Sequence, residues 1–465
     1  MFLNIDQKKP EKIALLDDTN KSITYGELVK FCNDLSEKQL QRGLVLCLCD
    51  NSVDSAVGYI SLIENKLVPI MLSVNTDPKL IESFIKNYEP MYIFSPKSNE
   101  YISEDSTKIL SYGEFGLVSR SNNIDDLNEN LSILLPTSGS TGSPKLVRYK
   151  YGNLESNAEN VAKGLKWTDS EIGFMDLPMN YTMSLNVINV HLWLGARVVL
   201  TKHNILSREY WSQLDGKDIT NITGVPFSYE LLEKLGLYRK NLPKLNYLCQ
   251  GGGKLPNDRF KSLTKYAKET NKYFIPTFGT TETSARMSFL PSNFVDEKIG
   301  SIGKPFPYGK MYLIDEDNNE ITNSDVRGEL VYEGPNVTMG YAMNKSDLLL
   351  DDEWCGKYIT GDYASIDEDG FFYIQGRKSR FLKLLGHRVS LDQTELLIKD
   401  EFKIECACTG TDECMVIYIT DSEKTESVHE FVSKKMDLYM GLFKVKVISE
   451  IPRNEAGKTM YKLLK

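Results

Sequence analysis

The sequence predicts an α/β protein: a large N-terminal domain of helix-covered β-sheets with a small β-rich subdomain, then a small α+β domain at the C-terminus. Strand-like and helical segments alternate over residues 1–130, which is typical of a parallel sheet covered by helices. Short strands of alternating polarity lie between glycine- and proline-rich turns over 300–376. Two strands, a helix and a further strand are predicted over 401–465.

Length and composition indicate an ordinary globular protein. At 465 residues the chain is long enough for about three domains or subdomains. Hydrophobic residues make up 41% and charged residues 26% of the chain, as is normal for a soluble fold. The formal net charge of −9 argues against a basic nucleic-acid-binding surface, so we expect no nucleic-acid partner. A nucleotide would have to be held by local hydrogen-bond donors.

Nothing in the sequence predicts export or a membrane span. The N-terminus lacks the apolar core of a signal peptide, and no window approaches the ~20 apolar residues that cross a bilayer. The eight cysteines include Cys47, Cys49, Cys406 and Cys408. Their alternate spacing inside apolar runs favours small core residues over a zinc site, since none of the four histidines lies near them. We expect a cytoplasmic protein with free thiols.

The N-terminal part of the chain predicts a scaffold without catalytic groups. Thr24 and Glu27 form a capping box at the start of an amphipathic helix. Strands are predicted at 44–49 and 68–72, with a helix between them. The polar stretch 99–130 is interpreted as a surface excursion. Beyond it, apolar patterns predict helices at 153–163 and 225–235 and strands at 133–135, 146–147, 245–248 and 275–278. The stretch 177–185 is interpreted as a strand end that breaks into a loop and then a helix through Leu192 and Leu194.

The loop over 137–145 joins two apolar strands and has the composition of an anion-binding turn. Glycines let backbone N–H groups approach a ligand closely, hydroxyls donate further hydrogen bonds, and the lysine adds a mobile positive charge. A solvated Ser/Gly connector is the alternative. The P-loop of NTPases is excluded by spacing, because it needs Gly-Lys-Ser/Thr in succession. The loop reads Thr137, Ser138, Gly139, Ser140, Thr141, Gly142, Ser143, Pro144 and Lys145.

Two further turns follow predicted strands. The first contains Gly251, Gly252 and Gly253. Without side chains it leaves room for a flat base in the crevice at the carboxyl ends of the strands. The second turn supplies hydroxyls and one carboxylate, which suit a triphosphate and a hard cation, although Gly-Thr-Thr-Glu is also common as a helix N-cap. It reads Phe278, Gly279, Thr280, Thr281, Glu282 and Thr283.

Three charged residues near the C-terminus are candidates for the same nucleotide. Asp362 follows a strand, where a carboxylate can accept hydrogen bonds from two ribose hydroxyls. Arg377 can close over the ribose and a phosphate. Lys458 follows a glycine on a terminal loop. Taken singly, Asp362 and Lys458 are as well explained as solvated loop residues.

Together these motifs resemble the signatures of one family. The loop at 137–145 matches at every position the phosphate-binding signature of the adenylate-forming, or AMP-binding, superfamily, and the later motifs follow in that superfamily's order down to Lys458. The chain therefore resembles acyl- and aryl-CoA ligases, peptide-synthetase adenylation domains and D-alanine–carrier ligases. The resemblance implies an N-terminal domain over 1–376 that binds ATP and the acid, and a mobile C-terminal domain over 377–465 that carries Lys458.

The resemblance also implies a role for each candidate residue. Lys458, Thr281 and Glu282 would be catalytic, and Glu282 would also bind Mg²⁺. The loop from Thr137 to Lys145 would hold the phosphates of ATP. The adenine and ribose would contact Gly251, Gly252, Gly253, Phe278, Gly279, Thr280, Asp362 and Arg377.

The acid pocket and the hinge are implied in the same way. Asn180, Tyr181 and Thr283 would line the pocket, and Asn180 stands where relatives often carry histidine or another aromatic residue. Ser379 stands at the usual pivot, where Asp or Lys is common; serine is compatible because a hinge needs only torsional freedom. No acidic residue lies between positions 177 and 200. A substrate ammonium group would lack a partner there, which favours a plain acyl or aryl acid.

The implied reaction has two steps. A small carboxylic acid attacks ATP and gives an acyl-adenylate and pyrophosphate; an external thiol, of CoA or of the phosphopantetheine on an acyl carrier protein, then accepts the acyl group. Rotation at the hinge would withdraw Lys458 and admit the thiol. Three alternatives stay open: an amino-acid–carrier-protein ligase, a non-catalytic nucleotide-binding homologue, and an NTPase that releases ADP rather than AMP.

Overall fold

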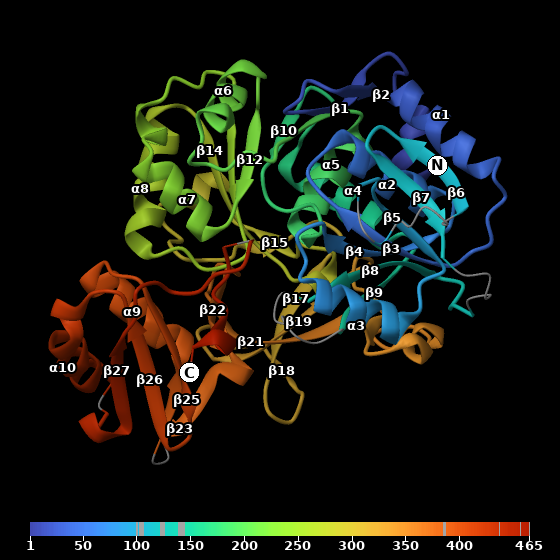
Figure 1. Cartoon of the computed structure of the whole chain (residues 1–465). Coiled ribbons are helices and arrows are strands. Elements are labelled where there is room, and N and C mark those ends of the chain that lie inside the picture. The colour runs from blue at the N-terminus through green and yellow to red at the C-terminus, as the bar shows by residue number, and fades with distance from the viewer. Residues whose placement is uncertain are drawn as a thin grey trace.

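The computed structural model describes residues 1–98, 101, 107–120, 126–137, 145–384, 387–436, 438–455 and 457–464. These residues form two large β-sheets, a smaller sheet beside them and a C-terminal lobe (Figure 1). The predicted α/β class is confirmed, and Thr24 and Glu27 form the predicted capping box. Among the described residues no helix combines the length and apolarity that crossing a membrane requires.

The eight-stranded sheet carries the first strand-helix-strand repeat. Its strand order is β20-β9-β8-β4-β3-β5-β7-β6, and the predicted strands β3 and β4 pair in parallel with Leu44 opposite Val68. β8 and β9, which flank the loop at 137–145, are antiparallel neighbours. The strands are β3 (Leu44–Cys49), β4 (Val68–Ser73), β5 (Tyr92–Pro96), β6 (Thr107–Tyr112), β7 (Phe115–Ser119), β8 (Leu131–Pro136), β9 (Leu146–Lys150) and β20 (Gly340–Ala342).

The expectation of a surface excursion over 99–130 is wrong where the structure describes it. β6 and β7 form an antiparallel hairpin there, and β7 pairs with β5. Phe115 and Leu117 are buried in the central core. The stretch is polar on average, but a strand depends on alternation of polarity rather than on its mean.

The nine-stranded sheet presents the carboxyl ends of its parallel strands to the site. Its order is β16-β15-β14-β13-β12-β10-β11-β1-β2, and β10 to β14 run parallel. β12, β13 and β14 therefore end side by side, as the sequence predicted for the two glycine turns. The strands are β1 (Ile13–Asp17), β2 (Ser22–Thr24), β10 (Ile172–Met175), β11 (Arg197–Leu200), β12 (Asn221–Gly224), β13 (Tyr247–Gln250), β14 (Tyr273–Phe278), β15 (Ser288–Phe289) and β16 (Lys304–Pro305).

Helices cover both faces of each large sheet. The apolar cores place α6, α7 and α8 outside the nine-stranded sheet, α1, α2, α4 and α5 with the core between the sheets, and α3 outside the eight-stranded sheet. The helices are α1 (Tyr25–Ser36), α2 (Val53–Glu64), α3 (Pro78–Tyr88), α4 (Asn153–Leu165), α5 (Thr182–Leu194), α6 (Arg208–Gly216), α7 (Pro226–Lys234) and α8 (Asn257–Glu269).

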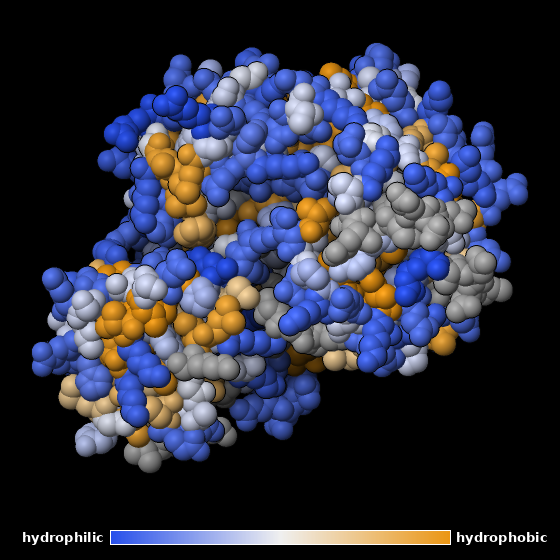
Figure 2. All heavy atoms as spheres, in the orientation of Figure 1, coloured by the Kyte–Doolittle hydropathy of each residue, from blue (hydrophilic) through white to orange (hydrophobic). Residues whose placement is uncertain are grey.

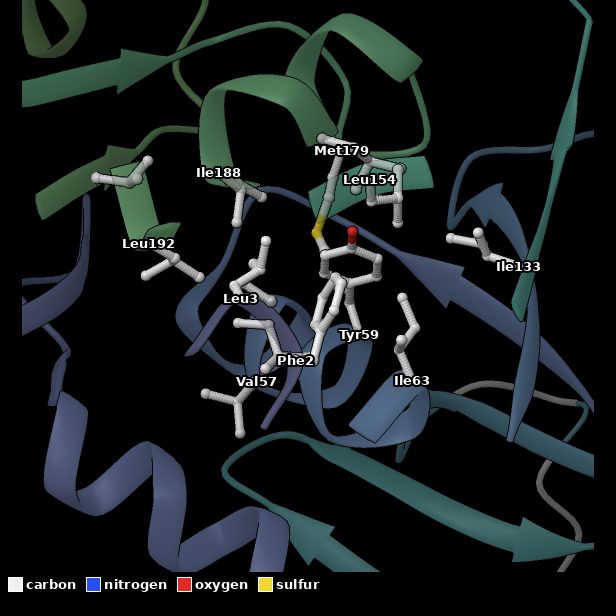
Figure 3. Close-up of a cluster of buried hydrophobic side chains, with 14 of the residues drawn as sticks. Phe2, Leu3, Val57, Tyr59, Ile63, Ile133, Leu154, Met179, Ile188 and Leu192 are labelled. Atoms are coloured by element: carbon white, nitrogen blue, oxygen red, sulfur yellow. The ribbon is translucent and has the colours of Figure 1, made fainter. Parts of the chain in front are cut away.

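Helices α2 and α5 are buried on nearly every side, because they lie between the two sheets. Figure 3 shows the N-terminal Phe2 and Leu3 inserted among residues of both helices. The Phe2 and Tyr59 rings meet edge to face at 6.0 Å. Polar groups in this layer find partners inside it: the Tyr59 hydroxyl donates to Asn189 Oδ1 at 3.0 Å. This layer fixes α5, whose first turn borders the site.

The small β subdomain and the C-terminal lobe complete the chain. The lobe has its own core, built from 382–443 and separate from the other cores, and its helix α9 was not predicted. Figure 2 shows mostly hydrophilic side chains over the visible face of the molecule. The elements are β17 (Lys310–Ile314), β18 (Glu320–Ile321), β19 (Gly328–Glu333), β21 (Lys357–Ile366), β22 (Phe372–Arg377), β23 (Phe381–Leu384), β24 (His387–Ser390), α9 (Leu391–Phe402), β25 (Cys406–Thr411), β26 (Cys414–Ile419), α10 (Thr425–Met436) and β27 (Phe443–Val447).

The four cysteines of the alternating pairs are core residues, as predicted. Cys47 and Cys49 lie in the central core, and Cys406 and Cys408 in the core of the C-terminal lobe. Burial raises the pKa of the Cys47 and Cys406 thiols, so these side chains remain neutral.

A buried arginine fastens β9 to the segment around β20. Arg148 on β9 is fully buried, and all three of its guanidinium nitrogens donate hydrogen bonds. An ionised group at this depth is stable only when its donors are paired in this way. The acceptors, at 2.5–3.3 Å, are the carbonyls of Met339, Tyr341, Leu350 and Asp351 and the carboxylate of Glu353.

We expect Arg148→Met to lower the free energy of unfolding by about 3 kcal/mol, because several buried carbonyls would lose their donor. Urea denaturation followed by circular dichroism measures the loss. Lys150→Met is the matched control: Lys150 lies on the same strand and pairs with Asp352 at 2.6 Å, but it is partly exposed, so we expect less than about 1 kcal/mol. Equal losses in the two variants would contradict this account.

Candidate active site

A cleft of about 1180 Å³ lies where the C-terminal lobe meets the carboxyl ends of β12, β13 and β14. A second cavity of about 440 Å³ adjoins it and shares Arg377 and Ser379 with it. The smaller cavity is lined by Thr280, Glu282 and Tyr341, among others. The predicted site residues that line the cleft are Gly252, Gly253, Phe278, Gly279, Asp362, Arg377, Ser379 and Lys458.

Two glycines in these turns have a geometric reason to be glycine. Gly252 has a φ of +76° and packs against Val225, so a side chain there would be strained. A Cβ on Gly279 would lie 1.6 Å from the carbonyl oxygen of Ala285, because the chain doubles back beside it. Gly251 does not line the cleft but packs against Met183 and Thr277 below it.

The turn after β14 is held from below by hydrogen bonds to its backbone. Its residues Thr281–Thr283 form a short 3-10 helix capped by Thr280. The Tyr149 hydroxyl donates to the Thr281 carbonyl at 2.5 Å, and Thr338 donates to the Glu282 carbonyl at 3.0 Å. These bonds leave the Glu282 side chain to face the smaller cavity.

Thr283 occupies a structural position in this turn. Its side chain is fully buried, and its hydroxyl bonds to Thr280 at 3.2–3.3 Å. It lines neither cavity. A role for Thr283 in the substrate pocket therefore stays a prediction.

Tyr341 joins two predicted motifs that are far apart in the sequence. The Lys145 ammonium lies 3.4 Å from the centroid of the Tyr341 ring, a cation–π contact. The hydroxyl of the same tyrosine donates to Glu282 Oε1 at 2.7 Å. Trp354 packs edge-on against the ring at 5.0 Å and fixes its plane. The basic end of the loop and the acidic turn thus meet at one aromatic side chain.

Sequence reasoning missed Tyr341. The sequence places it inside the β-rich stretch 300–376 and gives it no role. A tyrosine next to a glycine offers no signal of its own, because its importance comes from β20 pairing beside β9. Ser138, Gly139, Ser140, Thr141 and Gly142 lie outside the described residues, so only the two ends of the predicted phosphate loop, Thr137 and Lys145, are placed.

Asp362 is a buried carboxylate with one oxygen unsatisfied by the protein. It is 3% exposed and lies opposite Arg377 in the β21–β22 pair, with Nε to Oδ1 at 3.3 Å. Its other oxygen, Oδ2, has no hydrogen-bond partner among the described groups. Burial raises the pKa of Asp362 to about 6, although Arg377 opposes the rise. An acceptor of this kind at a cleft suits the hydroxyl of a ligand.

Lys458 reaches the cleft from the C-terminal lobe. The Asn454 side chain accepts from the Lys458 backbone N–H at 2.9 Å and shapes the loop. Gly457, with a φ of +72°, packs against Phe227 and Val225 of the large domain. The Lys458 ammonium then lies 5.0 Å from the centroid of the Tyr181 ring. Burial and, to a smaller extent, the positive charge of Arg377 lower the pKa of Lys458, while Glu282 opposes the change. The resulting pKa is about 8.

Of the predicted acid-pocket residues, Tyr181 stands beside Lys458. Tyr181 is the N-cap of α5, and its hydroxyl and the Asn180 Oδ1 atom have no hydrogen-bond partner among the described groups. Tyr181 packs with Leu177, Met183, Val225 and Phe227 in a small apolar cluster.

The carboxylate nearest in sequence, Asp176, is engaged elsewhere. It accepts from the Tyr210 hydroxyl of α6 at 3.1 Å, on the opposite side of the nine-stranded sheet. Burial raises its pKa to about 6. It therefore does not supply the pocket with a partner for an ammonium group.

Ser379 lies between side chains that pair with different parts of the molecule. Before it, Lys378 pairs with Glu329 of the β subdomain at 2.8 Å. After it, Arg380 pairs with Asp392 and Glu395 of α9. The side-chain partners thus change at residue 379 from the β subdomain to α9, as a pivot requires. One backbone contact crosses this point, because the Arg377 N–H donates to Asp392 of α9 at 3.1 Å. The hinge itself stays a prediction.

Comparison with known proteins decides the family. The profile of the AMP-binding enzyme family matches residues 3–342. The chain is an AMP-binding enzyme. The superfamily predicted from the motifs is thus confirmed, and with it the prediction that the chain is an enzyme.

Relatives of this AMP-binding enzyme include CoA ligases. It is 27% identical to a 2-succinylbenzoate–CoA ligase of Bacillus cytotoxicus, over 98% of this chain and 96% of the relative. A ligase of the same name from Bacillus cereus is 28% identical over 73% of this chain and 70% of the relative.

Solved structures share its fold. o-Succinylbenzoate CoA synthetase from Bacillus subtilis, in complex with its acyl-adenylate intermediate, has a TM-score of 0.79 at 19% identity and covers 100% of this chain and 97% of its own. ATP-bound MatB from Rhodopseudomonas palustris has a TM-score of 0.79 at 22% identity, with the same coverage. At these identities the likeness shows the fold alone.

The pKa of Lys458 can be tested directly. Competitive acetylation of lysines across a pH series, analysed by mass spectrometry, should give Lys458 a midpoint at about pH 8. Arg377→Met should raise that midpoint, because it removes a positive charge that destabilises the ammonium. Lys378→Met, which removes a neighbouring charge already paired with Glu329, is the control and should leave it unchanged. An unchanged midpoint in Arg377→Met would show that the two groups do not interact.

Proposed function

We propose that this AMP-binding enzyme is an acid–CoA ligase, which forms an acyl-adenylate from ATP and a carboxylic acid and then passes the acyl group to the thiol of CoA. The observation that carries the proposal is that Lys458 of the C-terminal lobe lines one cleft with Asp362 of the large domain and with Arg377 at the boundary between the two. CoA as acceptor is supported by the names of the relatives, which are CoA ligases.

The cleft fits ATP in chemistry and in size. The unpartnered Oδ2 of Asp362 accepts from a ribose hydroxyl, and Arg377 lies beside it for the α-phosphate. Gly252, Gly253 and Phe278 leave a flat space for the adenine. The β- and γ-phosphates extend into the smaller cavity toward Lys145 and Glu282. There the Glu282 carboxylate offers the hard oxygen that Mg²⁺ prefers, and the ion, when bound, offsets phosphate charge.

Lys458 stabilises the charge that builds up during adenylation. The attacking carboxylate and the α-phosphate are both anionic, so bringing them together needs a positive group between them rather than proton transfer. A lysine with a pKa of about 8 is mostly protonated at pH 7 and can supply it. Partial desolvation strengthens the interaction with the anions, because less water screens the charge.

The second step needs Lys458 to leave. The loop of Lys458 meets the large domain where Arg453 lies over the Phe227 ring at 4.7 Å and where Gly457 packs on the same ring; elsewhere on the lobe, Lys403 pairs with Asp258 on α8. Rotation about Ser379 breaks these contacts without exposing the core of either lobe, since each core is separate. The thiol then approaches the adenylate through the space that the loop vacates.

The pocket fits an acid without an ammonium group. Tyr181, Met183 and Val225 present an apolar wall, and the nearby carboxylate of Asp176 is engaged by Tyr210. 2-Succinylbenzoate, the acid in the names of the relatives, is therefore the first substrate to test. All eight cysteines are unpaired as thiols, which supports a reducing, cytoplasmic location.

A panel of carboxylic acids, with 2-succinylbenzoate first, tests the proposed function. AMP release should require an acid, and thioester should form with CoA but not with a phosphopantetheinylated carrier protein. Formation of ADP instead of AMP would support the NTPase alternative. Nucleotide binding without pyrophosphate exchange for any acid would support a non-catalytic homologue. Turnover with amino acids and a carrier protein would support an amino-acid–carrier-protein ligase.

Lys458→Ala should lower the rate of adenylate formation by about 10²–10³-fold or more, because it removes a charge-stabilising group. Thioester formation from preformed acyl-adenylate and CoA should stay close to the wild-type rate, because Lys458 is absent from the cleft in that step. Pyrophosphate exchange measures the first half-reaction, and a thioester assay measures the second.

Lys462→Ala, a change on the same C-terminal segment but outside the cleft, is the control and should alter neither half-reaction. Equal losses of both half-reactions in Lys458→Ala would contradict the assigned role.

A further inference from the structure

A second buried positive charge lies below the cleft. Arg286 follows the turn at 281–283 and is 2% exposed. Its guanidinium makes one hydrogen bond to a side-chain oxygen, from Nη2 to Thr223 Oγ1 of β12 at 3.0 Å, and it lies beside the Cys249 thiol of β13. Nε and Nη1 have no hydrogen-bond partner among the described groups.

The contrast with Arg148 shows that Arg286 is incompletely paired. Both side chains are almost wholly removed from solvent, but Arg148 donates from all three nitrogens and reaches the carboxylate of Glu353. No described carboxylate forms an ion pair with Arg286. A buried guanidinium without a counter-charge costs folding free energy, so the fold retains one where a ligand supplies the missing anion.

The groups around Arg286 cannot serve as that anion. Burial raises the pKa of the Cys249 thiol and of the Tyr229 hydroxyl, so both remain neutral. Burial also lowers the pKa of His191 to about 4, so this side chain is an uncharged imidazole. Glu171 already has partners at the start of β12, where its carboxylate accepts hydrogen bonds from the Thr220 side chain at 2.5 Å and from the Asn221 side chain at 3.4 Å.

Arg286 is aligned with the cleft by two parallel strands. Thr223 lies two residues before Val225, and Cys249 lies three residues before Gly252; Val225 and Gly252 both line the cleft. Alternation along a strand puts Thr223 and Val225 on the same face, and two residues span about 7 Å. Val225 in turn contacts Gly457, the neighbour of Lys458. Arg286 itself lines neither cavity, but Thr223 and Cys249 connect it along their strands to Val225 and Gly252, which border the cleft.

Side chains along this line are polar or adaptable. Met183 of α5 lies between Gly251 and the mouth of the pocket, and a thioether side chain changes rotamer easily. Asn186 of α5 bonds to Asn157, which in turn donates to the Arg286 backbone carbonyl at 2.9 Å, so the arginine is fixed from its backbone. The Asn186 Oδ1 atom itself has no partner among the described groups.

We infer that Arg286 binds a second carboxylate of the acid substrate, so that the enzyme selects dicarboxylic acids over acids with an apolar far end. The inference rests on the proposed function and specifies its substrate class. The first carboxylate reacts beside Lys458, and the second pairs with the guanidinium of Arg286, whose Nε and Nη1 donors have no hydrogen-bond partner among the described groups. An acid without the second carboxylate leaves the guanidinium unpaired and binds more weakly.

Matched pairs of acids test the inference. 2-Succinylbenzoate and 4-oxo-4-phenylbutanoate differ only in the ring carboxylate, and suberate and octanoate differ only in the terminal one. For at least one of the two pairs, the wild-type enzyme should use the dicarboxylate with a kcat/KM at least about 100-fold higher than that for the matched monocarboxylate, as measured by pyrophosphate exchange. Arg286→Gln should remove most of that preference by lowering activity on the dicarboxylate, and Arg286→Lys should restore part of it.

Arg148→Gln is the control, because it also removes a buried arginine: it should lower the melting temperature and keep the preference between the acids. The wild-type enzyme alone can overturn the inference, by using the monocarboxylates as well as their partners. A preference that Arg286→Gln leaves intact would also overturn it and would assign Arg286 to the fold. The proposed function would survive both results, and it fails separately if no acid supports pyrophosphate exchange.

Discussion

Positive charge removed from water is the constraint on which this site depends. Lys458 lies in the cleft, where burial lowers its pKa, and Arg286 is buried below the cleft and incompletely paired. Each desolvated cation costs free energy until an anion approaches it. A ligand that brings phosphates and carboxylates offsets this cost, so the unbound protein is already arranged for anionic substrates.

The scaffold supports this arrangement by placing strand ends together. β12, β13 and β14 are parallel neighbours, so the turns that follow them open on the same crevice. The eight-stranded sheet contributes from the other side through β9 and β20, which Arg148 fastens together. Tyr149 and Tyr341 project from these strands to the turn that carries Glu282. Residues from both sheets therefore meet at one carboxylate.

The C-terminal lobe contributes Lys458 to the cleft. Its core is separate, and its link to the rest passes through Ser379, where side-chain pairing changes from the β subdomain to α9. A lobe attached in this way can present Lys458 in one orientation and withdraw it in another at little cost to either core. In the proposed mechanism, this separation would allow one cleft to serve both chemical steps.

The sequence by itself determined the fold class and the family, because turns and strand ends are local features that residue order records directly. Tertiary structure alone decided that Tyr341 joins Lys145 to Glu282, that the hydroxyl of Thr283 serves the turn, and that 107–119 is a hairpin. It also decided that Arg286 is buried and incompletely paired. These properties depend on which strands lie side by side, and the burial of a charge is a property of its surroundings rather than of the residue.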